Sequence, residues 1–485
     1  MDIQIFYFLL TAILATAGYI IRRKVVSYLL LIPFVGLQIF YTYHAFSSLN
    51  QTEDRYFRAD HISLIFLTVL TILLIPTILH SYVYAASRND TEKTISIHNG
   101  TLMILFAAIT GALVSSHLGQ LWAFTEASTL SATVLIYNKQ DANSLEAAWK
   151  YVFISSIAIS LAFIGILFLG FAARDAGVSE FGLDELRQAA PKMSPTWMKM
   201  SFILIVCGFS GKMGIAPFFM VDIDAKDRAP TPISAIFASG FINLGFVAIL
   251  RVYEIFAGTS ILGWMNNLLT IIGCVSIFFA TSYLQRVKGY KRMFAYSGLE
   301  HGGIVLLALA AGGLGYLAML FHLVVHSFAK SSMFYQVGQV YRVFLHKSID
   351  NTGNYFKLNP VGGVVLLIGF FCVNAMPPTG MFLSEYLTFQ AMFQADRIIP
   401  AVLVLILLTF NLFALGRNFM QLLFGNHPEY ERKDFPKINP IESVTQLILL
   451  AIVVYLGINP PAFLMDFLHQ AIAHLPQTTQ LVMKP

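Results

Sequence analysis

The sequence predicts an all-α, polytopic membrane protein. Three observations support this fold class: 57% of the 485 residues are hydrophobic, only 12% are charged, and apolar segments recur along the whole chain. A soluble domain is typically about a quarter charged, whereas a helix of about 20 apolar residues crosses a hydrocarbon core about 30 Å thick. The longest polar stretch, near residues 172–199, is too short to form a soluble domain.

We expect about fourteen membrane spans from the apolar segments. Their centres lie near residues 13, 36, 74, 107, 128, 158, 209, 244, 273, 299, 329, 375, 411 and 455. In the first segment the acidic Asp2 precedes the apolar run, and the basic residues at 22–24 follow it. A cleavable signal peptide has the opposite order of charge, so we interpret this segment as a membrane helix.

The loops that carry basic residues predict the orientation. They are Arg22–Lys24, Arg286–Arg292, Arg342–Lys357 and Arg417–Lys437. All four lie on one side of the predicted membrane, and cytoplasmic loops are usually the basic ones. We therefore expect both termini on the non-cytoplasmic side of a bacterial or archaeal cytoplasmic membrane.

Two of the predicted spans, the seventh and the twelfth, contain helix breakers. Pro217 interrupts one, and Pro377, Pro378 and Gly380 interrupt the other. Broken helices at matching positions of two halves are typical of transporters built from inverted repeats. We predict two five-helix repeats, at residues 98–258 (helices 4–8) and 259–425 (helices 9–13). Residues 1–97 would form helices 1–3, and residues 426–485 helix 14 and a tail.

Eight ionisable side chains fall inside predicted spans: Glu126, Lys212, Glu300, His301, His322, His326, Lys330 and Glu385. A charge at mid-bilayer costs about 2.5–3.5 kcal/mol on insertion scales, so each one is a functional hypothesis.

His322, His326 and Lys330 follow one another at intervals of four residues, which places them on one helix face. Such a stripe suits a hydrated proton path along the membrane midplane. The alternative for a single histidine is an interhelical hydrogen bond. A metal site at the histidine pair is less favoured, because no third ligand is evident.

Lys212 and Glu126 are the ion pair that we expect, since neither tolerates burial alone. A partner that changed their separation could release or bind a proton at Lys212. The alternative is a static ion pair that only fixes helix packing.

The remaining motifs argue against an active site in this chain. Cys207, Cys274 and Cys372 lie in apolar runs without the spacing of a cluster or disulfide framework. The sequence shows no nucleotide-binding loop and no nucleophile constellation. We therefore expect a non-catalytic subunit with no cofactor of its own.

Five collinear segments, over roughly residues 100–425, carry a family resemblance. They read LWAFTEASTL, KMGIAPFFMVDIDAKDRAPTPISA, KGYKRMFAYSGLEHGG, HLVVHSFAKSSMF and PPTGMFLSEY. Together they resemble the antiporter-like, proton-conducting subunits of NADH:quinone oxidoreductase, group 4 membrane hydrogenases, formate hydrogenlyases and Mrp cation/proton antiporters. Glu300 and Glu385 favour the hydrogenase-type large subunit.

This resemblance implies roles for individual residues. Glu126 would be the modulating glutamate and Lys212 the central lysine of the first half. Lys330, with the two histidines before it, would connect the halves, and Glu385 would be the terminal carboxylate. Asp224 matches the aspartate of a loop after the broken helix. Members of the family work in multi-subunit complexes and carry no redox cofactor themselves.

The chain also departs from the family pattern. Phe219 and Lys226 replace two motif histidines, and Val221 replaces a tryptophan. Asn243 stands where many relatives have a second lysine, and an amide cannot be protonated, although it can hydrogen-bond water. The first half would then pass protons by water, or be idle. The charges at 222–228 would form a salt-bridge cluster at the cytoplasmic edge or dock a partner.

The sequence thus predicts a proton-translocating subunit driven by a partner, most simply a redox partner. The proton-transfer residues would be Glu126, Lys212, His322, His326, Lys330 and Glu385, with Asn243, Asp224, Glu300 and His301 as auxiliaries. Alternative functions are a subunit of an inorganic-carbon (CO2/bicarbonate) uptake complex, with a soluble zinc-binding partner, and an Mrp-type antiporter subunit that also moves Na⁺. Partners would be other membrane subunits and a peripheral soluble subunit, without nucleic acid.

Overall fold

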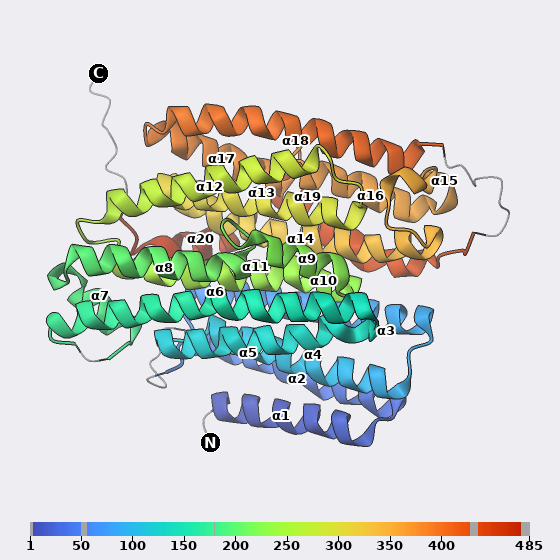
Figure 1. Ribbon diagram of the computed structural model, residues 1–485, viewed down its shortest axis with the longest axis horizontal. Coiled ribbons are helices and arrows are strands. Elements are labelled where there is room, and N and C mark those ends of the chain that lie inside the picture. Colours follow the sequence, from blue (N-terminus) through green and yellow to red (C-terminus); the bar gives the residue numbers. More distant parts are fainter. Residues whose placement is uncertain (1–2, 50–55, 179, 427–434, 477–485) are drawn as a thin grey trace.

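A computed structural model describes residues 3–49, 56–178, 180–426 and 435–476. These residues form long helices that run side by side (Figure 1). Among the described residues, eleven helices are long and apolar enough to cross a membrane. The predicted class, an all-α polytopic membrane protein, is confirmed.

The chain order explains how the bundle is built. The long helices are α1 (Ile3–Ile21), α2 (Lys24–Ser47), α3 (His61–Arg88), α4 (Glu92–Leu113), α5 (Leu118–Ile136), α6 (Ala142–Asp175), α8 (Pro195–Met213), α11 (Ile242–Phe256), α12 (Leu262–Leu284), α13 (Tyr290–Ala311), α14 (Leu314–Phe344), α18 (Ile398–Phe424) and α19 (Val444–Ile458). The shorter ones are α7 (Leu183–Ala189), α9 (Phe219–Arg228), α10 (Thr231–Ile236), α15 (Tyr355–Leu358), α16 (Pro360–Val373), α17 (Gly380–Gln394) and α20 (Ala462–Ile472). A π-helical turn, Phe237–Phe241, joins α10 to α11.

Local sequence fixes several helix starts. Asp60 accepts a hydrogen bond from the backbone N–H of Ser63 at the start of α3. Asp141 and Ser144 form a reciprocal capping box at the start of α6. These side chains satisfy backbone donors that the first turn of a helix leaves free. Each predicted span centre falls in a helix, except residue 375, which lies between α16 and α17.

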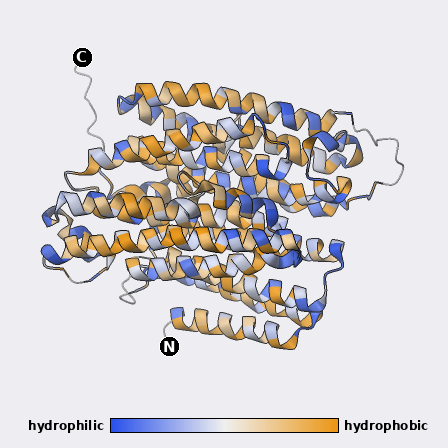
Figure 2. Cartoon of the chain, viewed as in Figure 1, coloured by the Kyte–Doolittle hydropathy of each residue, from blue (hydrophilic) through white to orange (hydrophobic). Residues whose placement is uncertain are grey.

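Polarity is reversed relative to a soluble protein. The most apolar stretches of α1 and α18 are largely exposed, whereas those of α10–α11, α13 and α14 are entirely buried. Among the spanning helices, α13 and α14 are also the least apolar. Figure 2 shows the outer helices coloured predominantly as hydrophobic. A membrane solvates the apolar outer surface, so the central helices are free to carry polar side chains.

Both predicted helix breaks are present. The first separates α8 from α9: Gly214 takes a left-handed conformation (φ 73°) and its N–H bonds to the carbonyl of Ser210. The second separates α16 from α17 at residues 374–379, and Thr379 caps α17. Each break exposes backbone groups inside the bundle, where only protein or water can satisfy them.

The bundle has two distinct ends. The first residues of α1 and the helix α20 lie toward one end, and α15 lies toward the other (Figure 1). At the first end, Arg251 of α11 makes two hydrogen bonds to Asp60, of 2.6 and 2.7 Å. His474 and Arg187 both contact Glu254. This network ties the start of α3 and the C-terminal segment to α11.

Candidate functional site

The predicted polar stripe lies on α14, at the centre of the bundle. His322, His326 and Lys330 are all buried, with at most 1% of each residue exposed. The two imidazole rings are nearly parallel, with centroids 6.0 Å apart. Lys330 Nζ donates a hydrogen bond of 2.6 Å to Ser297 Oγ on α13. The stripe therefore faces α13 rather than lipid.

His301 of α13 joins the stripe to the second helix break. Its ring centroid lies 5.2 Å from that of His322 and 5.1 Å from that of His326. Its Nε2 is 3.1 Å from the carbonyl of Val373, the last residue of α16, and its Nδ1 is 3.6 Å from the carboxylate of Glu385 on α17. His322 Nδ1 is 2.9 Å from Ser384 Oγ on the same helix. Three imidazoles and a carboxylate thus form one cluster.

Glu300 adds a second carboxylate to this cluster. It is buried on α13 and lies within electrostatic range of both Lys330 and Glu385. A buried carboxylate and a buried ammonium stabilise each other's charge, and separating or neutralising one shifts the other. Glu300 and His301, which we predicted only as auxiliary to the proton-transfer residues, lie inside the cluster.

The first break holds Lys212 in a different environment. Its Nζ donates a hydrogen bond of 3.1 Å to the Tyr151 hydroxyl and lies 4.7 Å from the centroid of the Phe241 ring. Aromatic faces attract a buried cation. Only 3% of Lys212 is exposed.

The predicted contact ion pair between Lys212 and Glu126 is wrong. The Glu126 carboxylate accepts hydrogen bonds from Ser156 (2.9 Å) and Thr129 (3.3 Å) instead. The two charges still lie within electrostatic range of each other. Hydroxyl donors near Glu126 and the Tyr151 hydroxyl near Lys212 satisfy each charge locally, so direct contact is not required.

Sequence reasoning missed a buried ion pair on α9. Lys226 and Asp222 bond to each other and are 0% and 2% exposed. A Cβ on Gly214 would lie 2.5 Å from the Asp222 carboxylate, and one on Gly298 of α13 would lie 3.5 Å from Lys226 Nζ. The pair therefore spans the space between the first break and α13.

The Asp222–Lys226 pair also links Lys212 at the first break electrostatically to the stripe on α14. Asp222 lies within range of Lys212, and Lys226 lies within range of Lys330 and His326. The i, i+4 spacing of an acid and a base among apolar residues was the available signal. The prediction of an exposed loop at this segment did not include a buried Asp222–Lys226 pair.

The structure corrects that interpretation in two respects. Asp224 lies in α9 rather than in a loop, because the chain resumes a helix directly after the break. Its carboxylate pairs with Arg292, and Asp227 lies 3.5 Å from both Arg292 and Lys347. Asp224 and Asp227 thus take part in the predicted salt-bridge cluster. Asp222 and Lys226 instead form a separate, buried pair.

Asn243 lies beside the stripe. Its Nδ2 donates a hydrogen bond of 2.9 Å to Ser327 Oγ, on the turn of α14 between His326 and Lys330. Its Oδ1 has no hydrogen-bond partner among the described residues. The same holds for buried atoms of Glu300, His301, His322 and His326. Buried polar atoms are normally satisfied by protein or water. These unpartnered atoms therefore mark where water would bind.

The fold and the site together define a class: an integral membrane protein with two broken helices and a buried row of ionisable groups. The chain belongs to the family described as NADH:quinone oxidoreductase/Mrp antiporter, transmembrane, whose model matches residues 115–410. The resemblance that the sequence motifs predicted is confirmed.

The relatives include subunits of hydrogenases, of an F(420)H(2) dehydrogenase, of an antiporter and of an NADH-quinone oxidoreductase. The chain is 29% identical to a hydrogenase-4 component F homolog of Methylacidiphilum infernorum over 378 residues, which cover 76% of this chain and 79% of the relative. It is 28% identical to formate hydrogenlyase subunit 3 of Escherichia coli, over 61% of this chain and 48% of that protein.

Two solved structures share the fold. A chain of an archaeal membrane-bound sulfane sulfur reductase superposes with a TM-score of 0.84, at 19% identity and over 98% of both chains. A chain of the Mrp complex from Dietzia sp. DQ12-45-1b gives 0.81, at 15% identity and again over 98% of both chains.

Proposed function

We propose that this chain is a proton-translocating membrane subunit of a multi-subunit complex. The single observation that carries the proposal is the row of buried ionisable side chains from one broken helix to the other, in which each group lies within electrostatic range of the next. Buried charges are expensive in a membrane and are retained where they work. Family membership supports the same conclusion.

The proposed route begins at Glu126 and Lys212. It continues through Asp222 and Lys226 to Lys330, whose ammonium lies near Glu300. It ends at the cluster of His301, His322, His326 and Glu385. Water next to the unpartnered polar atoms would complete the hydrogen-bonded connections.

Each step is a change of charge in a low-dielectric environment. A partner that displaces Glu126 alters the electrostatic stabilisation of Lys212, which then favours or disfavours its proton. The neighbouring Asp222–Lys226 pair responds, because its carboxylate interacts with both lysines. Moving one charge against 100 mV requires about 2.3 kcal/mol, which a rearranged buried ion pair can supply.

The proposed architecture has fourteen crossings. α5, the pair α8–α9 and the pair α16–α17 would add three crossings to the eleven apolar helices. Two inverted repeats would then contain α4–α11 and α12–α18. The position of one broken helix in each half supports this division.

The proposed orientation places the basic turns in the cytoplasm. Under the positive-inside rule, the turn after α14 would face the cytoplasm and both termini the other side. The common position of the start of α1 and of α20 at one end agrees with it.

The proposed energy source is a redox partner, with all redox cofactors in other subunits. The similarity to a hydrogenase-4 component F homolog and to a formate hydrogenlyase subunit supports this choice. The fold shared with the Mrp complex favours a second function, cation/proton exchange. Proton transport that requires Na⁺ would distinguish the second function from the first.

Membrane vesicles that hold the native complex provide the test. Lys212→Ala and Glu385→Gln should each abolish partner-driven acidification, reported by a pH-sensitive dye, while the complex still assembles. The control Lys150→Gln alters an exposed lysine that pairs with Glu146 on the surface of α6. Acidification at the wild-type rate in both test variants would refute the proposal.

A further inference from the structure

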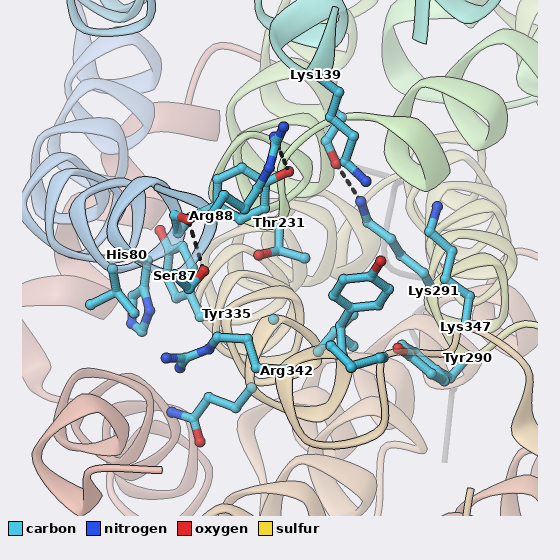
Figure 3. A pocket seen from close by; sticks show the side chains of 18 residues that line it. His80, Ser87, Arg88, Lys139, Thr231, Tyr290, Lys291, Tyr335, Arg342 and Lys347 are labelled. Carbon is cyan, nitrogen blue, oxygen red and sulfur yellow. Dashed lines mark hydrogen bonds between the residues drawn. The ribbon is translucent and has the colours of Figure 1, made fainter. Parts of the chain in front are cut away.

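A cavity of about 350 Å³ lies among the helices, and Figure 3 shows the side chains that line it, none of which belongs to the proposed pathway. Its walls come from the last turns of α3 and α14, the first turns of α10 and α13, and the turn after α5. Five cationic side chains line it: Arg88, Lys139, Lys291, Arg342 and Lys347. Among the described residues, no carboxylate does.

Carboxylates outside the cavity neutralise only part of this charge. Arg342 pairs with Glu442, and Arg88 lies 3.6 Å from Asp90. Lys347 lies 3.5 Å from Asp227, but that carboxylate also contacts Arg228 and Arg292. Asp227 thus serves three cations, one of which, Arg292, also pairs with Asp224.

Lys139 and Lys291 have no carboxylate within ion-pair distance in the described part of the chain. Lys291 donates to the backbone carbonyl of Ala229, and Lys139 Nζ lies 5.7 Å from the centroid of the Tyr341 ring. Burial, and then the charges of Lys347 and Arg88, lower the pKa of Lys139. An anion among these side chains would relieve the repulsion.

Neutral groups at the cavity suit an anion with an apolar part. The hydroxyls of Ser87 and Thr231 line it, together with Tyr84 and Val337. Tyr341 and Leu345, which also line it, are 36% and 69% exposed. Arginine and lysine side chains are the usual partners of phosphate oxygens.

We propose that this cavity binds the phosphate group of an anionic ligand, supplied either by a lipid headgroup or by free phosphate. Basic pockets between membrane helices are suited to anionic headgroups. The proposal does not depend on proton translocation. It does connect to α9, because Ala229 lines the cavity and Lys347 holds Asp227 at the end of that helix.

The test uses the purified, delipidated full chain in detergent and measures its thermal unfolding midpoint. Three probes are added separately: phosphatidylglycerol, phosphatidylcholine and inorganic phosphate. We expect phosphatidylglycerol to raise the midpoint more than phosphatidylcholine if the ligand is a lipid, and inorganic phosphate to raise it alone if the ligand is the free anion.

Lys139→Gln and the double variant Lys139→Gln/Lys347→Gln should weaken the effective probe at least about tenfold, which corresponds to about 1.4 kcal/mol. The single variant removes a lysine that contacts the Tyr341 ring and pairs with no carboxylate in the described part of the chain, so it should fold. Lys288→Gln/Lys437→Gln, two exposed lysines outside the cavity, is the charge-matched control. No anion-dependent shift, or equal weakening in the control, would overturn the proposal.

Discussion

The two broken helices hold their ionisable groups in different ways. At the first break, Lys212 is enclosed by aromatic rings, and Asp222, one of the acids within its electrostatic range, already pairs with Lys226. At the second break, Glu385 contacts an imidazole and keeps 13% of its side chain exposed. Lys212 is thus enclosed within the bundle, whereas Glu385 is partly exposed.

This difference indicates a division of labour in the proposed mechanism. Ammonium groups in a closed site respond to neighbouring charges, because no solvent screens them. Imidazoles and a partly exposed carboxylate can pass a proton onward to water. The first half would therefore sense the partner, and the second half would release the proton.

Lys330 connects the two regions, and its removal should have the largest effect. Lys330→Ala takes away the ammonium between Lys226 and Glu300, so we expect partner-driven proton transport to fall to the level of vesicles without the protein. Dye-reported acidification measures this effect. Transport at half the wild-type rate or more would show that the two breaks work independently.

The Asp222–Lys226 pair tests whether the first half conducts. Either single neutral variant leaves a buried charge unpaired, at a cost of about 3–5 kcal/mol of stability. The double variant Asp222→Asn/Lys226→Met removes both charges, so it should unfold at a temperature closer to the wild type.

With folding preserved, we expect this double variant to transport protons about tenfold more slowly, a change of about 1.4 kcal/mol in the barrier. Unchanged transport would show that the pair has a purely structural role and that only the second half conducts protons.

Asn243 should have a smaller effect. Asn243→Ala removes the hydrogen bond to Ser327 and one acceptor for water beside the stripe. A lost hydrogen bond of about 0.5–1.5 kcal/mol predicts roughly threefold slower transport. Ser327→Ala removes the same bond but keeps the amide, and equal effects in the two variants would attribute the loss to this bond alone.

The packing of the two breaks predicts a difference in stability without loss of function. A Cβ on Gly245 of α11 would lie 2.4 Å from the backbone nitrogen of Met213, at the first break. One on Gly380 would lie 2.8 Å from a side-chain atom of Val325 and 3.1 Å from the backbone carbonyl oxygen of Val453, which is a looser fit. Gly245→Ala should therefore cost about 1–3 kcal/mol and Gly380→Ala less. Thermal unfolding in detergent measures both, and the reverse order would contradict the contrast in packing.

The sequence predicted the all-α membrane fold and the common helix face of His322, His326 and Lys330. Apolar length determines a membrane helix, and the spacing of His322, His326 and Lys330 determines a common face. The partner of Glu126 was not predictable, because hydroxyls of Thr129 and Ser156 satisfy it and serine or threonine gives no specific signal.

Asp222 and Lys226 were misplaced for a different physical reason. A charged segment after a proline is typical of an exposed loop, and the i, i+4 spacing of Asp222 and Lys226 indicates an ion pair without showing that α9 turns back into the bundle. Only the contact of this helix with Gly214 and Gly298 reveals where the charges lie.

The most direct measurement is infrared difference spectroscopy of the native complex during turnover. If protons pass along the buried row, the spectrum should show a carboxyl band appearing and disappearing with turnover, and Glu385→Gln should remove it while Lys150→Gln does not. Turnover with proton transport but without any change in a carboxyl band assigned to Glu385 would contradict the account.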